Sequence, residues 1–225
     1  MNLILLDIDG TLVDSMELEK KYFTQAVCEG LGISKIKTDW SSFTNPTDSG
    51  IIRETMREEL GQLCHPEHIE KCKDRYIELL GDHLDQNPAA LPPIAGAHGF
   101  IDFLEYHENY QFAVATSGWR FPAEMKLTAA GFDFDNWVLY TCSEHEYKKE
   151  AMKAAHMTAR QKYGSEFEKV IYIGDSRSDL RFANELGYGF LGRGEEYAHT
   201  NIWGVEGVKD FTDIRLVEGR INRTI

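Results

Sequence analysis

Short apolar runs alternate with helical patterns along most of the chain. Each run is a few residues long and is bounded by glycine, proline or polar residues, which is typical of strands. Such runs predict strands at Leu3–Leu6, Phe112–Thr116, Trp137–Thr141, Val170–Gly174 and Tyr188–Leu191. Between the later runs, apolar residues recur at helical spacing. This alternation of strands with helices predicts an α/β fold built on a parallel sheet.

The first two predicted strands are separated by about a hundred residues, far more than one crossover helix requires. Within this interval, apolar residues recur at spacings of three and four, with charged residues between them. The pattern predicts helices at Met16–Gly30, Ser49–Leu60 and Pro66–Leu84. The stretch "NPAALPPIAG" then ends the helical pattern. We therefore predict an inserted α-helical cap.

The predicted cap divides the chain into two parts. We expect the cap to comprise residues 16–87, with hinges at Leu12–Ser15 and Asn87–Pro93. The core that contains the sheet would then consist of residues 1–15 and 88–225. A ligand held between core and cap would contact both.

The composition is that of an ordinary globular protein. With 225 residues, of which 42% are hydrophobic, the chain can bury a sizeable core. Its formal net charge of -13 repels nucleic-acid phosphates and anionic lipid surfaces, so we expect neither nucleic acid nor a membrane as a partner. Because we find neither an apolar run of membrane-spanning length nor an export leader, we expect a cytoplasmic protein. Its 4 cysteines would be reduced thiols.

Polar residues follow three of the predicted strands. Ligands of an open parallel sheet bind outside the carboxyl ends of its strands, so these residues are expected to meet at one edge. They are Asp7, Asp9, Gly10 and Thr11 after the first strand, Thr116, Ser117 and Gly118 after the second, and Asp175 and Asp179 in "GDSRSD". Clustered carboxylates repel each other unless a cation lies among them, and oxygen ligands suit Mg²⁺. The sequence therefore predicts a magnesium site.

A cationic side chain is also expected at this edge. In the stretch "SEHEYKKEAM", Lys148 and Lys149 begin the helix that follows the third predicted strand. The spacing favours Lys148, and Lys149 is the alternative. Such a lysine would balance charge on a carboxylate and on phosphate oxygens together.

Together these groups indicate phosphoryl transfer. An ionised Asp7 can attack phosphorus in line and form an aspartyl phosphate. Asp9 can protonate the leaving oxygen and afterwards activate water. Thr116, the backbone amides near Gly118 and the lysine would hold the transferring oxygens, because phosphoryl transfer depends mostly on positioning and electrostatics. Gly10 would allow the sharp turn between these groups.

The order of these motifs resembles that of the haloacid dehalogenase superfamily of aspartate-nucleophile phosphatases, in its phosphoglycolate phosphatase and β-phosphoglucomutase subgroup. The resemblance rests on "DIDGT" at Asp7–Thr11, "ATS" at Ala115–Ser117, the lysine at 148 or 149 and "GDSRSD" at Gly174–Asp179. It implies a Rossmann-like core with a helical cap inserted after the first motif. It also implies Mg²⁺ bound by the Asp7 carboxylate, the Asp9 main-chain carbonyl and Asp175. One departure is that proline commonly follows the lysine in this family, and here it does not.

Several functions share these motifs. Asp9 disfavours halide displacement, which needs no proton donor and no Mg²⁺, and a signalling receiver would carry its acceptor aspartate on a later strand. A phosphosugar mutase of the β-phosphoglucomutase kind would keep the same residues. A catalytically silent binding protein is the non-enzyme alternative. We expect a Mg²⁺-dependent phosphoric monoester hydrolase that acts on a small phosphorylated metabolite, as a monomer or homodimer.

The predicted cap is expected to select the substrate. In "TDSGIIR", Gly50 would loosen the loop and Arg53 would bind a distal anion, unless it is simply a solvated helix residue. Trp119 and Arg120 follow Gly118 directly and could contact the leaving group. Phosphoglycolate, a sugar phosphate and a nucleotide monophosphate are all compatible with these observations.

Two smaller features have alternative interpretations. Asp179 would either cap its helix or orient a metal ligand. Cys64, His68 and Cys72 are spaced by four, which would place them on one side of a helix. Pro66 and the missing fourth ligand favour half-buried cap residues over a metal site there.

Overall fold

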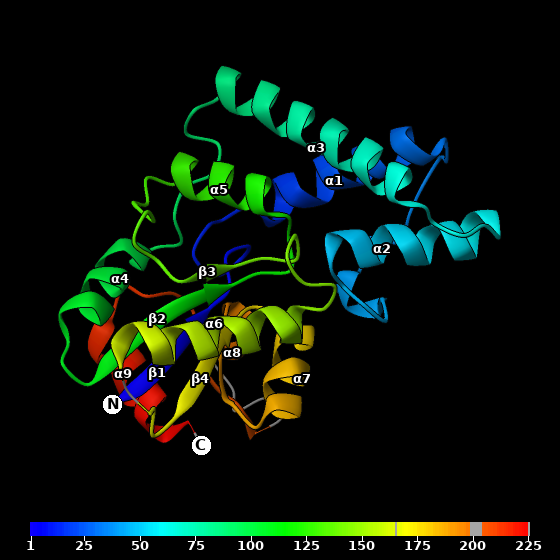
Figure 1. Ribbon diagram of the computed structural model, residues 1–225. Coiled ribbons are helices and arrows are strands. Elements are labelled where there is room, and N and C mark those ends of the chain that lie inside the picture. Colours follow the sequence, from blue (N-terminus) through cyan, green and yellow to red (C-terminus); the bar gives the residue numbers. More distant parts are fainter. Residues whose placement is uncertain (165, 199–203, 225) are drawn as a thin grey trace.

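The computed structural model describes residues 1–164, 166–198 and 204–224, and it contains a parallel β-sheet flanked by helices (Figure 1). Within these residues the sheet has 6 strands in the order β3-β2-β1-β4-β5-β6, and every neighbouring pair is parallel. The strands are β1 (Asn2–Leu6), β2 (Tyr110–Ala115), β3 (Leu139–Tyr140), β4 (Val170–Gly174), β5 (Gly189–Arg193) and β6 (Glu206–Val208). The predicted α/β fold with a parallel sheet is confirmed.

The helices and short helical turns connect these strands. They are α1 (Met16–Leu31), η1 (Trp40–Ser42), α2 (Asp48–Thr55), η2 (Met56–Leu60), α3 (Pro66–Gln86), α4 (Ala97–Tyr106), α5 (Arg120–Ala129), α6 (Lys148–Tyr163), α7 (Arg177–Leu186), α8 (Glu195–Ala198) and α9 (Ile214–Arg223). In the described part of the chain, none of the helices combines the length and the apolar character needed to cross a membrane.

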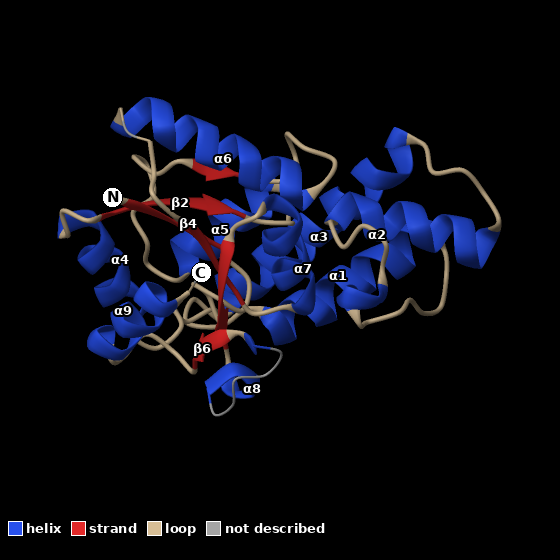
Figure 2. Cartoon of the chain, turned by 90° about the horizontal axis from the view of Figure 1, so that it is seen from below, coloured by secondary structure: helices blue, strands red, loops and turns tan. Residues whose placement is uncertain are grey.

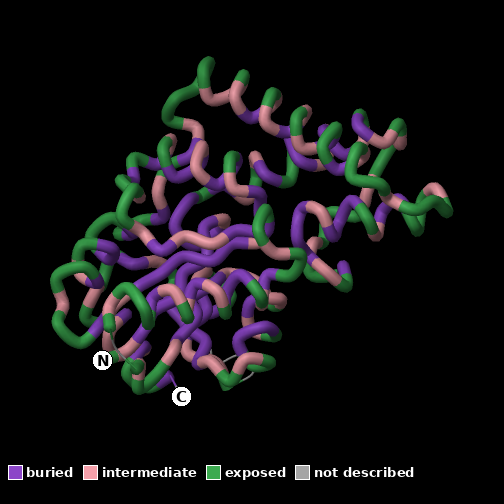
Figure 3. The backbone as a smooth tube through the Cα atoms, in the orientation of Figure 1, coloured by how far each residue is buried: buried purple, intermediate pink, exposed green. Residues whose placement is uncertain are grey.

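Strand β1 contributes to an apolar core on each face of the sheet. Successive side chains of a strand point to opposite faces, so Leu3 and Leu5 join a cluster with α6 and α7, while Ile4 and Leu6 join one with α4, α5 and α9. All four side chains are fully buried. Figure 3 shows the strands as the buried centre of the fold, with exposed positions on the outer sides of the helices. This double burial explains why the strand reads as a continuous apolar run.

Helices α1, α2 and α3 form a helical insertion, residues 16–86, between β1 and β2 (Figure 1). Phe23 on α1 meets Tyr76 on α3 edge to face, with ring centroids 5.8 Å apart. Figure 2 shows the insertion beyond the ends toward which the strand arrows point. The division into a core and a separate cap domain stays a prediction, because the insertion shares one apolar cluster with α4 and α5.

Some predicted boundaries differ from the observed ones. The third strand was expected at Trp137–Thr141, but β3 comprises only Leu139–Tyr140. Strand β6 was not predicted, because its three residues include one large apolar side chain and are too few to show a periodic pattern. The helix expected at Ser49–Leu60 is α2 followed by the π-helical turn η2. These differences lie at short or terminal elements, where local patterns are weakest.

Candidate active site

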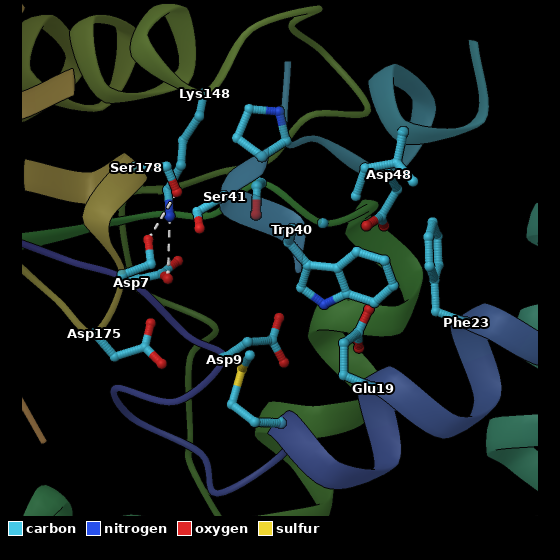
Figure 4. A pocket seen from close by; sticks show the side chains of 16 residues that line it. Asp7, Asp9, Glu19, Phe23, Trp40, Ser41, Asp48, Lys148, Asp175 and Ser178 are labelled. Atoms are coloured by element: carbon cyan, nitrogen blue, oxygen red, sulfur yellow. Dashed lines mark hydrogen bonds and ion pairs between the residues drawn. The ribbon is translucent and has the colours of Figure 1, made fainter. Parts of the chain in front are cut away.

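A cavity of about 80 Å³ lies between the carboxyl edge of the sheet and the helical insertion (Figure 4). Half of its lining comes from the sheet side: Asp7, Asp9, Ser117, Gly118, Lys148, Asp175, Ser176 and Ser178. The other half comes from the insertion: Met16, Glu19, Phe23, Trp40, Ser41, Pro46, Asp48 and Ile51. The predicted edge therefore does carry a cavity, and the insertion closes it.

Asp7 is buried at the end of β1 and is paired with Lys148 from the first turn of α6. The Lys148 Nζ atom lies 3.0 Å from Asp7 Oδ2 and 2.5 Å from Asp179 Oδ1. Burial raises the pKa of Asp7 to about 7, although Lys148 opposes the shift. Burial acts to lower the pKa of Lys148, but Asp179 and Asp7 together hold it well above its ordinary value. Lys148 therefore stays charged beside the nucleophile candidate.

Lys149 points elsewhere. It lies roughly 100° around α6 from Lys148, and its Nζ atom pairs with Glu185 at 3.0 Å on the surface. The structure therefore places Lys148, and not Lys149, at the cavity. The predicted substrate contact of Lys149 is not supported.

Gly10 allows Asp175 to approach Asp7. Its φ angle is +67°, and a Cβ atom at this position would lie 2.0 Å from Asp175 Oδ2. Any side chain there would displace the Asp175 carboxylate, and the left-handed backbone would be strained as well. Arg193 at the end of β5 lies 3.9 Å from the same Asp175 oxygen.

Three carboxylates form a group that fits a small divalent cation. Oxygens of Asp7, Asp175 and Asp179 lie within 4.8 Å of one another. Asp179 is already engaged, because it accepts hydrogen bonds from Lys148 and from Ser176. The buried Asp7 Oδ1 atom has no hydrogen-bond partner among the described residues. Asp7 and Asp175 therefore keep oxygens free for a cation, and an all-oxygen donor set suits Mg²⁺.

Asp9 has one oxygen held and one free. Its Oδ1 atom accepts a hydrogen bond from Ser15 Oγ at 2.5 Å and forms an ion pair with Lys126 Nζ at 2.8 Å. Its Oδ2 atom lies 3.9 Å from the position that a Cβ atom of Gly118 would occupy. The carboxylate is therefore oriented by two donors, with its other oxygen toward the loop after β2.

Lys126 is a site residue that the sequence reasoning missed. It is buried on α5, and it binds Glu19 of α1 as well as Asp9. Glu19 also accepts a hydrogen bond from the Tyr76 hydroxyl of α3. The available signal was a lysine at an apolar position, since Lys126 stands three residues after the buried Ala123 and directly before the buried Leu127.

Asp48 fastens the start of α2 to the loop after β2. Its carboxylate accepts the backbone N–H of Trp119 at 2.9 Å, and its own backbone N–H donates to Ser117 O at 3.4 Å. Burial, and then the nearby Glu19 carboxylate, raise the pKa of Asp48 well above its ordinary value. From the sequence this region was expected to be a specificity loop, and Asp48 was not among the residues singled out in it.

Trp119 connects the core to the insertion. Its side chain is 3% exposed, its indole N–H donates to Ser49 Oγ at 3.0 Å, and its ring packs against Phe23 and Tyr76. The expected contact of Trp119 with a leaving group is not supported, because its ring packs against Phe23 and Tyr76 and its indole N–H is bonded to Ser49.

The two predicted arginine contacts are also outside the cavity. Arg53 follows Asp48 by five residues, which turns it roughly 140° around α2, and its guanidinium lies 3.7 Å from Glu146. Arg120 Nε pairs with Glu144 at 2.5 Å. Neither residue lines the cavity, so the role of Arg53 in binding a distal anion is not supported.

The threonine hydroxyls of the first two motifs lie behind the cavity lining. Thr116 Oγ1 accepts the backbone N–H of Gly118 at 3.3 Å, which shapes the loop that Ser117 and Gly118 present to the cavity. Thr11 is fully buried, and its hydroxyl has no partner among the described residues. Thr116 therefore stabilises the loop conformation and does not itself line the cavity.

The cysteines and histidine of the insertion have other partners. Cys72 is fully buried against Gly30, where an added Cβ atom would lie 2.5 Å from Cys72 Sγ. His68 Nδ1 accepts the backbone N–H of His65 at 3.1 Å. Cys64 Sγ lies near the His65 carbonyl, at 3.7 Å. These contacts are those of helix packing and capping.

Residues 4–192 match the family model described as haloacid dehalogenase-like hydrolase. Among curated proteins, none matches the chain significantly. A hydrolase from Pseudomonas syringae has a similar structure, with a TM-score of 0.76, 19% sequence identity and coverage of 98% of this chain and 99% of that chain.

Two further solved structures are similar over nearly the whole chain. A predicted phosphoglycolate phosphatase from Haemophilus somnus has a TM-score of 0.68 and 17% identity, with coverage of 96% of this chain and 97% of that one. A candidate β-phosphoglucomutase from Bacteroides vulgatus has a TM-score of 0.72 and 15% identity, with coverage of 99% and 91%. At these identities the likeness establishes a shared fold.

Proposed function

Since the chain belongs to the haloacid dehalogenase-like hydrolases, we propose that it hydrolyses a small phosphomonoester, with Mg²⁺ as cofactor and Asp7 as the nucleophile. One observation carries this proposal. Asp7 is buried at the cavity, one of its oxygens is paired with Lys148, and the other has no partner among the described residues. A carboxylate held in this way can present an oxygen to phosphorus.

The first half-reaction uses Asp7, Lys148 and Asp9. The Asp7 carboxylate attacks phosphorus, the bond from phosphorus to the ester oxygen breaks, and Asp9 gives its proton to that oxygen so that an alcohol leaves. Lys148 offsets negative charge on Asp7 and on the phosphoryl oxygens. The result is an aspartyl phosphate on Asp7.

The second half-reaction returns the enzyme to its starting state. Asp9, now ionised, takes a proton from water as the water oxygen attacks phosphorus, and inorganic phosphate and the Asp7 carboxylate are released. Ser15 and Lys126 hold the other Asp9 oxygen, so the reactive oxygen keeps its direction in both steps.

The Asp7 carboxylate, the Asp175 carboxylate and the main-chain carbonyl of Asp9 would hold the cation. When bound, Mg²⁺ would neutralise charge on the phosphoryl oxygens and on the aspartates around them. Gly10 keeps Asp175 in reach of this position, since any side chain at residue 10 would displace it.

The helical insertion would act as a cap that excludes water. It contributes half of the cavity lining, and Trp119 ties the loop after β2 to α2. A volume of about 80 Å³ has room for a phosphoryl group and a compact alcohol. This size agrees with a small phosphomonoester.

A direct test is the trapping of the intermediate. The wild-type protein with Mg²⁺ and a small phosphomonoester should release phosphate, and mass spectrometry of peptides quenched in acid should find phosphate on Asp7. The Asp7→Asn variant should neither release phosphate nor carry the modification. Phosphate release by that variant at the wild-type rate would contradict the proposal.

A further inference from the structure

The insertion side of the cavity carries two carboxylates that differ in their pairing. Glu19 is satisfied by Lys126 and by the Tyr76 hydroxyl. Asp48 is 7% exposed, and its carboxylate accepts one hydrogen bond, from the uncharged backbone N–H of Trp119. Among the described residues, no cation lies within ion-pair distance of Asp48, and Lys126, which acts on it electrostatically, is paired with Asp9 and Glu19. Burial and Glu19 favour the neutral form of Asp48, and an ammonium group bound beside it would favour the ionised form.

Asp48 lies where the leaving group of a bound phosphomonoester would extend. The position of a Cβ atom on Gly118 is a convenient reference point, because it would lie 3.6 Å from Asp48 Oδ2 and 3.9 Å from Asp9 Oδ2. Asp9 Oδ2 is the oxygen that would protonate the leaving alcohol. Asp48 therefore lies near the oxygen beside which the alcohol would leave.

Aromatic rings complete this end of the cavity. Phe23 and Trp40 both line it, with ring centroids 5.7 Å apart in an edge-to-face arrangement (Figure 4). Aromatic faces and carboxylates together attract an ammonium group and disfavour an anion. The cationic side chain in the described lining is Lys148, which forms ion pairs with Asp7 and Asp179 at the opposite end of the cavity. In the described lining, a distal anion would find no free cation.

From this charge pattern we propose that the site selects phosphomonoesters of small amino alcohols, with the ammonium group of the leaving alcohol bound by Asp48 beside Phe23 and Trp40. This inference rests on the proposed phosphatase function. The size of the cavity agrees with it. A water molecule needs about 10–15 Å³ of such a volume, so 80 Å³ holds a phosphoryl group and an alcohol with few non-hydrogen atoms.

Three phosphomonoesters of similar size test the proposal, because they differ chiefly in the charge at the far end. They are O-phosphoethanolamine, which is cationic there, propyl phosphate, which is neutral, and phosphoglycolate, which is anionic. With Mg²⁺ and wild-type protein, kcat/KM for O-phosphoethanolamine should exceed that for propyl phosphate by at least about tenfold, the effect of one hydrogen bond to a charged group. Phosphoglycolate should be the poorest substrate.

Two variants distinguish the effect of the Asp48 charge from the effect of the protein's overall negative charge. Asp48→Asn keeps an oxygen that can accept the Trp119 N–H but removes the charge, so the ratio of kcat/KM between O-phosphoethanolamine and propyl phosphate should fall close to one. Glu54→Gln is the matched control. Glu54 lies on the same helix outside the cavity and accepts the Thr44 N–H, so this variant should keep the wild-type ratio.

Calorimetric titration of the Asp7→Asn variant with the same three compounds measures recognition without turnover. The expected order of affinity is the same as that of kcat/KM. Equal binding of all three compounds, a preference for phosphoglycolate, or an unchanged ratio in Asp48→Asn would overturn the inference. Ordered binding without any phosphate release by the wild-type protein would count against the hydrolase function alone.

Discussion

The Lys126 ammonium group of α5 lies 2.8 Å from the Asp9 carboxylate of the first motif, and its second partner is Glu19 of α1. One buried lysine therefore connects the proposed acid–base residue to the helical insertion. Because Tyr76 of α3 donates to the same Glu19 carboxylate, two helices of the insertion take part in positioning Asp9. The packing of the insertion therefore contributes to the orientation of Asp9.

Replacement of Lys126 by methionine should damage both turnover and stability. Asp9 would lose one of its two donors, so kcat should fall by about 10²-fold with a smaller change in KM. Glu19 would be left without its cation, at a cost of about 3 kcal/mol in the free energy of unfolding. Steady-state kinetics and urea unfolding measure the two effects.

The double variant Lys126→Met with Glu19→Gln separates the two effects. It removes the buried unpaired charge, so much of the stability should return while kcat stays low. Recovery of kcat together with stability would mean that Lys126 serves only the packing of the insertion.

Substitution of the two adjacent lysines of α6 should give opposite results. Lys148→Ala removes the cation next to Asp7, and kcat should fall by at least about 10²-fold. Lys149→Ala removes an exposed ion pair with Glu185, which contributes little, and kcat should stay within about twofold of wild type. Kinetics with one phosphomonoester suffice, and a greater loss in the Lys149 variant would refute the assignment of Lys148.

Removal of divalent metal should abolish hydrolysis. EDTA should stop phosphate release, because Asp7, Asp175 and the phosphate repel one another without a cation. Added Mg²⁺ should restore activity. Asp175→Asn should raise the Mg²⁺ concentration for half-maximal rate by at least about tenfold. Asp14→Asn, which changes an exposed aspartate, is the control and should respond to Mg²⁺ as the wild type does.

Loss of the Arg53 guanidinium should leave substrate binding intact. Since Arg53 pairs with Glu146 outside the cavity, Arg53→Ala should change KM for O-phosphoethanolamine and for phosphoglycolate by less than about twofold. A KM that rises for phosphoglycolate alone would restore Arg53 as an anion-binding residue, and it would weaken the case for a cationic leaving group.

Thiol labelling should follow burial. Burial raises the pKa of Cys72 to about 12, so almost none of it is thiolate at pH 8, and Cys142 is buried as well. A thiol reagent at pH 8 should therefore label at most Cys28 and Cys64 in the native protein and all four cysteines in denaturant. Mass spectrometry identifies the labelled residues. Rapid native labelling of Cys72 would show that α1 and α3 separate readily.

The amino-acid sequence by itself determined the sheet and the edge where the chemistry lies. The runs at Leu3–Leu6 and Val170–Gly174 are buried on both faces, so each strand is marked by its own residues. Asp7 and Asp175 follow their strands directly, Asp9 comes two residues after Asp7, and the parallel arrangement brings the strand ends together whatever the helices do. The helical content of the insertion was also readable, because an amphipathic helix repeats its pattern over several turns.

Only the tertiary structure decided which side chains face the cavity. Lys126, Glu19 and Asp48 are single residues on three helices, and nothing in their local patterns pairs them; the packing of the insertion on α5 brings them together. Arg53 and Lys149 were expected at the site and point away, because neighbouring positions on a helix differ by roughly 100° in direction. A sequence pattern specifies the apolar face of a helix. What its polar residues meet depends on the segments folded against them, and that information is not local.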